Sequence, residues 1–123
     1  MPTKKIEQQL SFYFTDNLEE TSQFYEDVLE LQLVRDQGTC RIYKVGRDGH
    51  IGFCERSLNK DKSGVIITFV VDDVDYWAGH LKNKGVQFEK KPTHNPLYGI
   101  YHCFFRDPNG YLLEIQKFDE PLT

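Results

Sequence analysis

The residues best suited to chemistry lie near the carboxyl end of the chain, in residues 101–118. Glu114 stands among leucines and an isoleucine, where a carboxylate is costly unless it faces water, a cation or a metal ion. Residues 107–110 read Asp-Pro-Asn-Gly, a turn sequence between two apolar runs, so the segment predicts a β-hairpin. Strand alternation places His102 on the same face as Phe104 and Glu114.

Two roles for this pair stay open. Glu114 and His102 could perform general acid–base catalysis, or they could form a hydrogen bond in the wall of a pocket. Glu114 could also pair with a cationic ligand, or simply face a solvated cleft. The other histidines, at positions 50, 80 and 94, give no comparable signal.

Composition excludes several classes of function. The net charge of −4 argues against a nucleic-acid binder, which normally presents a basic face. No apolar run approaches the roughly 20 residues of a membrane span, and no apolar segment follows the first lysines, so we expect no membrane association and no signal peptide. We therefore expect a cytoplasmic protein, in which Cys40, Cys54 and Cys103 are reduced, buried thiols, because their spacing matches no zinc or redox motif.

The elements that must position these residues occur twice. The first half predicts a strand at residues 6–15, a helix beginning at Asn17, and strands at 31–36, 40–45 and 50–55. The second half predicts a strand at 65–71, a helix from Asp73 to Gly85, a strand at 86–89, a loop at 91–99 and the closing hairpin.

This repetition indicates an internal duplication. Residues 16–18 match 72–74 at an offset of 56, and Gly49 matches Gly110 at an offset of 61. We therefore expect one domain, residues 1–123, built from modules at about 6–57 and 64–118 and joined by a polar linker at 58–63. Because one module has too little apolar surface to stand alone, the two should share a core and enclose a cleft.

Three segments carry a family resemblance: FTDNLEETSQFYEDVLEL, VVDDVDYWAGHLKNKGVQF and FFRDPNGYLLEI. Together they resemble the vicinal oxygen chelate superfamily, which includes glyoxalase I, bleomycin and fosfomycin resistance proteins, extradiol dioxygenases and methylmalonyl-CoA epimerase. The resemblance implies an α+β fold of two βαβββ modules around a shared cleft, usually in a homodimer. Glu30 departs from the family pattern where a glycine is common, and Asn109 where an aspartate is usual.

The resemblance also implies four metal-ligand positions. They lie on the first and last strand of each module, and counting from the helix caps and turn glycines places Leu10, Phe53, Ile66 and Glu114 there. Three of these side chains have no lone pair to donate, so we expect no metal site and no cofactor. A shift of one residue would bring Gln9 or Cys54 toward the site instead.

A ligand site in the cleft is the remaining expectation. Aromatic side chains that face the cleft, Arg41 as an anion-orienting cation, and Tyr98 with Tyr101 as an adjustable lid would form it. The expected ligand-binding residues are Leu10, Phe12, Arg41, Phe53, Ile66, Thr68, Tyr98, His102, Phe104 and Glu114. Phe14 and Tyr43 are further aromatic candidates for the same surface.

The leading hypothesis is metal-independent binding or sequestration of a small apolar or aromatic molecule, neutral or cationic, similar to the bleomycin-resistance branch. The alternative is a glyoxalase-type lyase, isomerase or dioxygenase that uses a displaced divalent metal, or acid–base catalysis by His102 and Glu114. A third hypothesis is a domain whose concave face docks a protein segment. Whether the protein is an enzyme stays undecided at this level.

Overall fold

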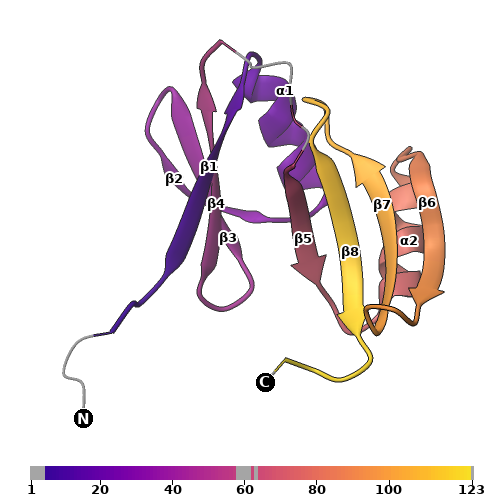
Figure 1. Ribbon diagram of the computed structural model, residues 1–123. Coiled ribbons are helices and arrows are strands. Elements are labelled where there is room, and N and C mark those ends of the chain that lie inside the picture. The colour runs from indigo at the N-terminus through magenta and orange to yellow at the C-terminus, as the bar shows by residue number, and fades with distance from the viewer. Residues whose placement is uncertain (1–4, 58–61, 63, 123) are drawn as a thin grey trace. The chain divides into compact units, whose positions relative to one another are not determined.

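The computed structural model describes residues 5–57, 62 and 64–122. The chain divides into two compact units, Met1–Lys60 and Asp61–Thr123, each with one four-stranded mixed sheet and one helical segment (Figure 1). This is the α+β architecture of two βαβββ modules that the sequence predicts. The predicted linker 58–63 lies, apart from residue 62, outside the described residues. No helix among the described residues is long and apolar enough to cross a membrane.

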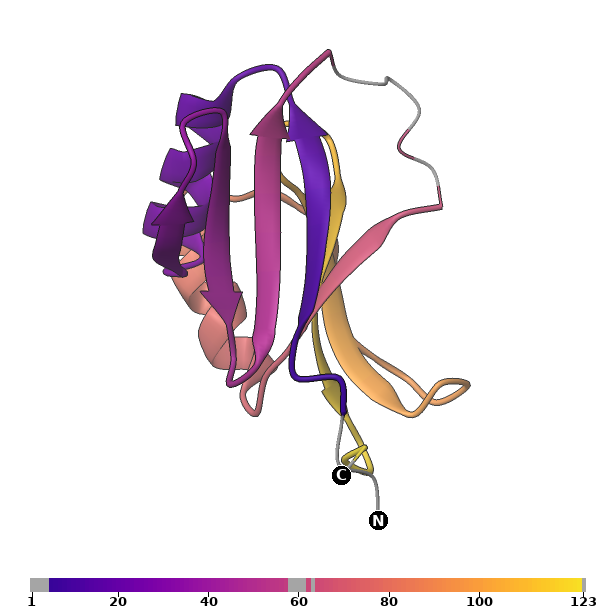
Figure 2. The ribbon, with the colours of Figure 1, turned by 90° about the vertical axis from the view of Figure 1, so that its left-hand side faces the viewer.

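The first unit follows the predicted order of elements. Its strands are β1 (Gln9–Thr15), β2 (Gln32–Asp36), β3 (Cys40–Val45) and β4 (Gly49–Glu55), and its helical segment comprises α1 (Leu18–Gln23) and a π-helical turn, η1 (Phe24–Val28). The sheet order is β1-β4-β3-β2, with β1 parallel to β4 and the other pairs antiparallel (Figure 2).

Helix α1 begins where the sequence predicts, because its first amide groups have side-chain acceptors. The Asn17 side chain accepts from the Glu20 backbone NH at 3.0 Å. Glu55, at the end of β4, accepts from the Leu18 NH at 3.0 Å and so ties the start of the helix to the sheet. Tyr25, in the π-helical turn, is fully buried and its ring lies 4.4 Å from that of Phe53. The core of the first unit therefore lies between its helix and its sheet.

The second unit repeats this arrangement. It contains β5 (Ile66–Val70), α2 (Val74–Asn83), β6 (Phe88–Asn95), β7 (Ile100–Arg106) and β8 (Leu112–Phe118), with the sheet order β5-β8-β7-β6 and α2 behind the sheet in Figure 1. Asp73 caps α2 by accepting from the Tyr76 NH at 2.9 Å. Strand β6 extends through most of the predicted loop 91–99, so that prediction was wrong. Pro92 and the polar residues around it left too little apolar alternation to indicate a strand there.

The helices end in the same backbone conformation through different residues. Glu30 has φ 58° and Gly85 has φ 90°, both in the left-handed region. Glu30 follows its cap Asn17 by 13 residues, whereas Gly85 follows Asp73 by 12. The π-helical turn accounts for the extra residue, because such turns arise from single-residue insertions into a helix. Glu30 thus occupies a conformation that glycine adopts at much lower cost.

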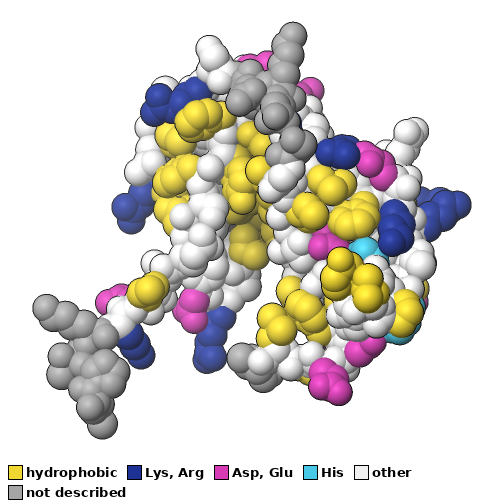
Figure 3. Space-filling view, in the orientation of Figure 1, with side chains coloured by type: hydrophobic (Ala, Val, Ile, Leu, Met, Phe, Trp, Pro, Cys, Tyr) yellow, Lys and Arg dark blue, Asp and Glu magenta, His cyan; other side chains and the backbone are white. Residues whose placement is uncertain are grey.

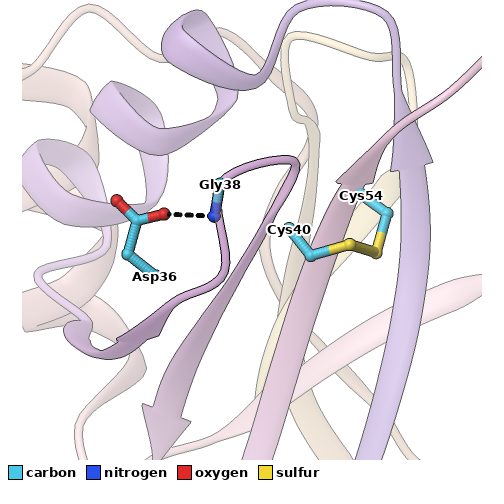
Figure 4. The surroundings of a disulfide bond; sticks show 4 residues. All are labelled: Asp36, Gly38, Cys40 and Cys54. Atoms are coloured by element: carbon cyan, nitrogen blue, oxygen red, sulfur yellow. Dashed lines mark hydrogen bonds between the residues drawn. A yellow bond between two sulfur atoms is a disulfide. The ribbon is translucent and has the colours of Figure 1, made fainter.

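The expectation of three reduced thiols was wrong for two of them. Cys40 and Cys54 face each other across β3 and β4 and form a disulfide, next to the turn in which Asp36 accepts from the Gly38 NH at 2.9 Å (Figure 4). The Glu55 NH donates to the Thr39 carbonyl, which makes Cys40 and Cys54 a non-hydrogen-bonded pair with close side chains. Sequence spacing gave no sign of this contact.

Cys103 is the free cysteine among the described residues. It is buried, as predicted, and burial raises the pKa of its thiol to about 11. A thiol with such a pKa stays protonated and unreactive near neutral pH.

Candidate functional site

Each sheet has one face covered by its own unit's helix and one face that this helix leaves uncovered, which we call the open face. In the first unit, Thr15, Tyr43 and Phe53 lie on the covered side and are fully buried. Alternation along the strands assigns the intervening side chains to the open face. Each open face is a candidate site by itself, and the two faces differ in chemistry.

The first open face is apolar along β1. Leu10, Phe12 and Phe14 point to it with 40%, 46% and 43% of their surfaces exposed. At the amino end of β1, a groove of about 350 Å³ is lined by Gln8, Leu10, Val34, Arg35, Ile42 and His50. Hydrophobic side chains also gather over this part of the first unit in Figure 3.

The Phe12 ring lies directly on the backbone of Gly52 in the adjacent strand β4. A Cβ atom added to Gly52 would meet the ring carbons at 2.5 and 2.6 Å, so only glycine leaves room for the ring in this position. The ring therefore occupies the space that a side chain at position 52 would need.

The structure corrects the register by which the last strands were compared. Leu10 pairs with His50 and Ile66 pairs with Leu112. Two residues further along each last strand stand Gly52 and Glu114, so Gly52, and not Phe53, is the counterpart of Glu114. Gly110 has φ 91° in its turn, whereas Gly49 already belongs to β4, and aligning these two glycines causes the error of one residue.

Two residues expected in the ligand site face the covered side instead. Phe53 packs against Tyr25 in the core. Arg41 donates to Ser22 at 2.8 Å and to Glu19 at 3.2 Å, both in α1, so it joins strand to helix and is not placed to orient a ligand. Tyr43 also faces this side, where burial raises its pKa to about 12 and its hydroxyl donates to Glu26 at 2.8 Å.

The second open face carries a buried polar network. His102 on β7 and Glu114 on β8 are only 3% and 7% exposed, and His102 Nδ1 lies 2.6 Å from Glu114 Oε2. Thr68 on β5 donates to Glu114 Oε1 at 2.8 Å. With its amide nitrogen turned toward Glu114, Gln116 donates to the two carboxylate oxygens at 3.2 and 3.0 Å. The predicted proximity of His102 and Glu114 is confirmed.

Lys90 on β6 completes the network at its outer end. Its Nζ lies 3.2 Å from His102 Nε2 and 6.0 Å from the centroid of the Phe104 ring, which itself stands edge-on to the imidazole. Since an ammonium group only donates, His102 Nε2 must accept, and its single hydrogen must lie on Nδ1. Glu114 therefore fixes the imidazole tautomer, and the imidazole in turn orients Lys90.

The other residues expected in the ligand site or its lid lie apart from the His102–Glu114 network. Ile66 points to the second open face and is half exposed, beside the Thr68 position on β5. Tyr98 lies in the β6–β7 turn and is largely exposed. The Tyr101 hydroxyl donates to Asp75 in the first turn of α2 at 2.6 Å, so Tyr101 belongs to the covered side and is no part of a lid with Tyr98.

Sequence reasoning missed Lys90 and Gln116 as members of the network. Gln116 follows Glu114 by two residues, so strand alternation already assigned it to the same face. Lys90 was missed because the predicted strand ended at residue 89 and the pairing of β6 with β7 could not be deduced. The Lys90–Phe104 pairing is the observation that brings this cation to the imidazole.

The family's metal-ligand positions do not fit a metal ion. Leu10 and Gly52 in the first unit and Ile66 in the second offer no donor atom, and the Phe12 ring fills the space above Gly52. Glu114 is the one ligand type at these positions, and its oxygens accept hydrogen bonds from Thr68 and His102. Across the described residues, no group of three or more His, Cys, Asp or Glu side chains is arranged to hold an ion.

Comparison with known proteins adds a family and a set of relatives. The family model described as Glyoxalase/Bleomycin resistance protein/Dioxygenase superfamily matches residues 7–115. A curated relative, the uncharacterized protein YraH of Bacillus subtilis (strain 168), is 30% identical over 109 residues, which cover 85% of this chain and 84% of YraH.

Solved structures show the same fold. The integron cassette protein HFX_CASS4, from the mobile metagenome of the Halifax Harbour sewage outfall, superposes with a TM-score of 0.79 at 25% identity, covering 90% of this chain and 97% of its own. Lactoylglutathione lyase from Agrobacterium tumefaciens superposes with a TM-score of 0.70 at 23% identity, covering 94% of both chains. At that identity the second likeness concerns the fold alone.

Proposed function

Because the chain belongs to the Glyoxalase/Bleomycin resistance protein/Dioxygenase superfamily, we propose that it binds a small apolar or aromatic molecule on its open sheet faces without a metal ion. The observation that carries this proposal is the replacement of a ligand position by Gly52 and the ring of Phe12. The substitution removes a donor from the open face and adds an aromatic surface in its place.

The exposed side chains of the first open face support the same function. Leu10, Phe12 and Phe14 present adjacent apolar surface on one strand face, and such surface is stabilised when a guest removes it from water. The neighbouring groove of about 350 Å³ falls within the size range of small-molecule sites. Aromatic rings at such positions favour planar guests, because offset stacking adds to the gain from apolar burial.

The buried His102–Glu114 pair favours a second candidate, acid–base catalysis. A carboxylate that fixes the tautomer of an imidazole is the arrangement by which many enzymes prepare a general base. Here, however, the Nε2 lone pair already accepts from Lys90, so a substrate proton could reach it only after Lys90 had moved. Binding without chemistry needs no such displacement, and for this reason we favour it.

A thermal-shift screen of aromatic compounds, followed by calorimetric titration of the best hit, tests the proposal. The titration is run once with a chelator present and once with added Zn²⁺ or Mn²⁺. We expect the same dissociation constant in both conditions and less than one tightly bound ion per ten protein chains. Binding that requires the metal, or one equivalent of an ion that resists the chelator, would contradict metal independence. Turnover of the bound compound, lost in His102→Asn, would favour catalysis.

The remaining expectations about the whole protein stay predictions. They are assembly into a homodimer, a cytoplasmic location, and no association with nucleic acid. The Cys40–Cys54 disulfide argues against the cytoplasmic location, because structural disulfides are uncommon in the reducing cytosol. If a protein segment occupies the open faces instead, we expect that no small aromatic compound in the thermal-shift screen changes the melting temperature.

A further inference from the structure

We propose that Lys90 is an anion-binding residue, so that the molecule bound at the second open face carries a carboxylate or a similar anionic oxygen beside its apolar body. This inference rests on the proposed binding function and specifies the chemical class of the guest. It depends on three properties of Lys90: its fixed orientation, its lack of a carboxylate partner and its neighbouring aromatic ring.

Hydrogen bonds to buried side chains fix the position of the Lys90 ammonium group. Glu114 accepts from His102 Nδ1 at 2.6 Å, and His102 Nε2 accepts from Lys90 Nζ at 3.2 Å. His102 and Glu114, the two inner residues of this hydrogen-bonded series, are almost completely buried. Because a free lysine side chain loses conformational entropy when it is immobilised, a lysine that is already oriented binds an anion at lower cost.

The positive charge of Lys90 is not neutralised directly by the protein. Among the described residues, no carboxylate oxygen lies within 4 Å of Lys90 Nζ, and its hydrogen-bond partner is a neutral imidazole. The adjacent Glu89 pairs instead with Arg106 on β7. An ammonium group has three donors, and the contact with His102 uses one of them. Donors therefore remain for a guest.

Phe104 supplies the apolar part of the subsite. Its ring is half-buried, stands edge-on to His102 at a centroid distance of 5.0 Å and lies 6.0 Å from Lys90 Nζ. A guest with an anionic oxygen on Lys90 can therefore place an aromatic or aliphatic body on this ring. In Figure 3 the face of the second unit opposite α2 shows basic, acidic and histidine side chains among hydrophobic ones.

The same geometry disfavours a cationic guest. Both oxygens of Glu114 already accept hydrogen bonds within the protein, from Thr68 and His102, and the carboxylate is buried beneath the imidazole. The net charge of −4 favours cations at long range, but salt screens this field over about 8 Å at physiological ionic strength. At contact distance, the ammonium of Lys90 determines the preference.

The test uses matched pairs of aromatic compounds that differ only in charge. Calorimetric titration compares 2-naphthoate with 2-naphthamide, and indole-3-acetate with indole-3-acetamide, on the full chain. We expect the wild-type protein to bind each carboxylate at least about tenfold more tightly than its amide. Lys90→Met keeps the apolar stem and should abolish this ratio while it preserves the affinity for the amides. Lys91→Met, at an exposed neighbouring position of β6, should leave the ratio unchanged.

Two outcomes would overturn the inference, and they have different meanings. If amides and carboxylates bind equally, or if Lys90→Met leaves the ratio intact, the role of Lys90 is wrong while the binding function survives. If no member of either pair binds, the proposed function fails together with the inference. His102→Asn serves as a further variant: it should reduce the carboxylate-to-amide ratio, which a purely structural role would not produce.

Discussion

The two open faces have the same topology, but at the equivalent position of the last strand they carry residues of opposite character. On the first sheet the position holds Gly52, covered by the ring of Phe12; on the second it holds Glu114, which accepts from Thr68 at the position equivalent to Phe12. A disulfide joins neighbouring strands on the first face, whereas hydrogen bonds join them on the second. The duplication thus preserved the backbone while the chemistry of the two faces diverged.

This divergence separates two tasks that a metal site would combine. The first face offers apolar area and little polarity, so it can contribute affinity without selectivity for charge. The second face offers one oriented cation on a buried polar support, so it can contribute orientation and selectivity. Each of the following predictions alters one face and uses the other as its reference.

The largest effect is expected from removing the centre of the polar network. His102→Ala removes the 2.6 Å hydrogen bond to the buried Glu114 carboxylate, so the free energy of unfolding should fall by about 3 kcal/mol. Urea denaturation measures the change. Thr68→Val removes a single hydrogen bond to the same carboxylate and should cost about 1–2 kcal/mol. Equal losses in the two variants would mean that the network is not centred on His102.

The disulfide should stabilise the first sheet nearly as strongly. Cys40 and Cys54 are 14 residues apart, and a loop of this length corresponds to a loss of about 2–3 kcal/mol when the bond is reduced. The double variant C40A/C54A should show the same loss and become insensitive to reductant.

Thiol titration tests the same bond without perturbing it. Near pH 8 the native protein should show no reactive thiol, because Cys103 is buried and its raised pKa keeps it protonated. Unfolding without reductant should expose one thiol, and unfolding with reductant should expose three. Three thiols without reductant would contradict the disulfide. Since the pKa of Cys103 is raised in the folded state, its contribution to stability is complete below about pH 9 and is lost toward pH 11.

A smaller effect is expected where Phe12 covers Gly52. Gly52→Ala places a methyl group 2.5 Å from the ring and should lower the free energy of unfolding by about 1 kcal/mol. In the double variant F12A/G52A the two losses should not add, because the ring that clashes is gone. Additive losses in denaturation experiments would mean that the ring does not lie on position 52.

The smallest effect concerns the ends of the helical segments. Glu30 and Gly85 share a left-handed conformation, so Glu30→Gly should raise the free energy of unfolding by about 0.5 kcal/mol. Glu30→Ala is the matched control and should give no gain, because alanine keeps the cost of the positive φ. A gain from alanine equal to that from glycine would show that side-chain loss, and not backbone conformation, causes the effect.

Local signals in the sequence predicted the frame of both units. The caps Asn17 and Asp73, the closing hairpin and the facing of His102 toward Glu114 follow from residue type and alternation, and the structure confirms each of them. These features depend on neighbours in sequence or on a tight turn, where propensity and geometry determine the outcome.

The failures arose where the answer depends on the pairing of distant strands. Phe53 was assigned to the open face because turn glycines were aligned, and parallel pairing of β1 with β4 corrects this to Gly52. Lys90 and the Cys40–Cys54 bond were missed for the same reason, since both depend on the register of antiparallel neighbours. A one-residue error in register reverses the face of every side chain.

The most direct test of the proposed division of tasks is an NMR titration of isotopically labelled protein with 2-naphthoate in the presence of a chelator. We predict saturable shifts at Lys90, His102 and Phe104 on the second open face, with helix α2 unaffected. Shifts confined to the covered faces, or shifts that arise only after a divalent metal ion is added, would contradict it.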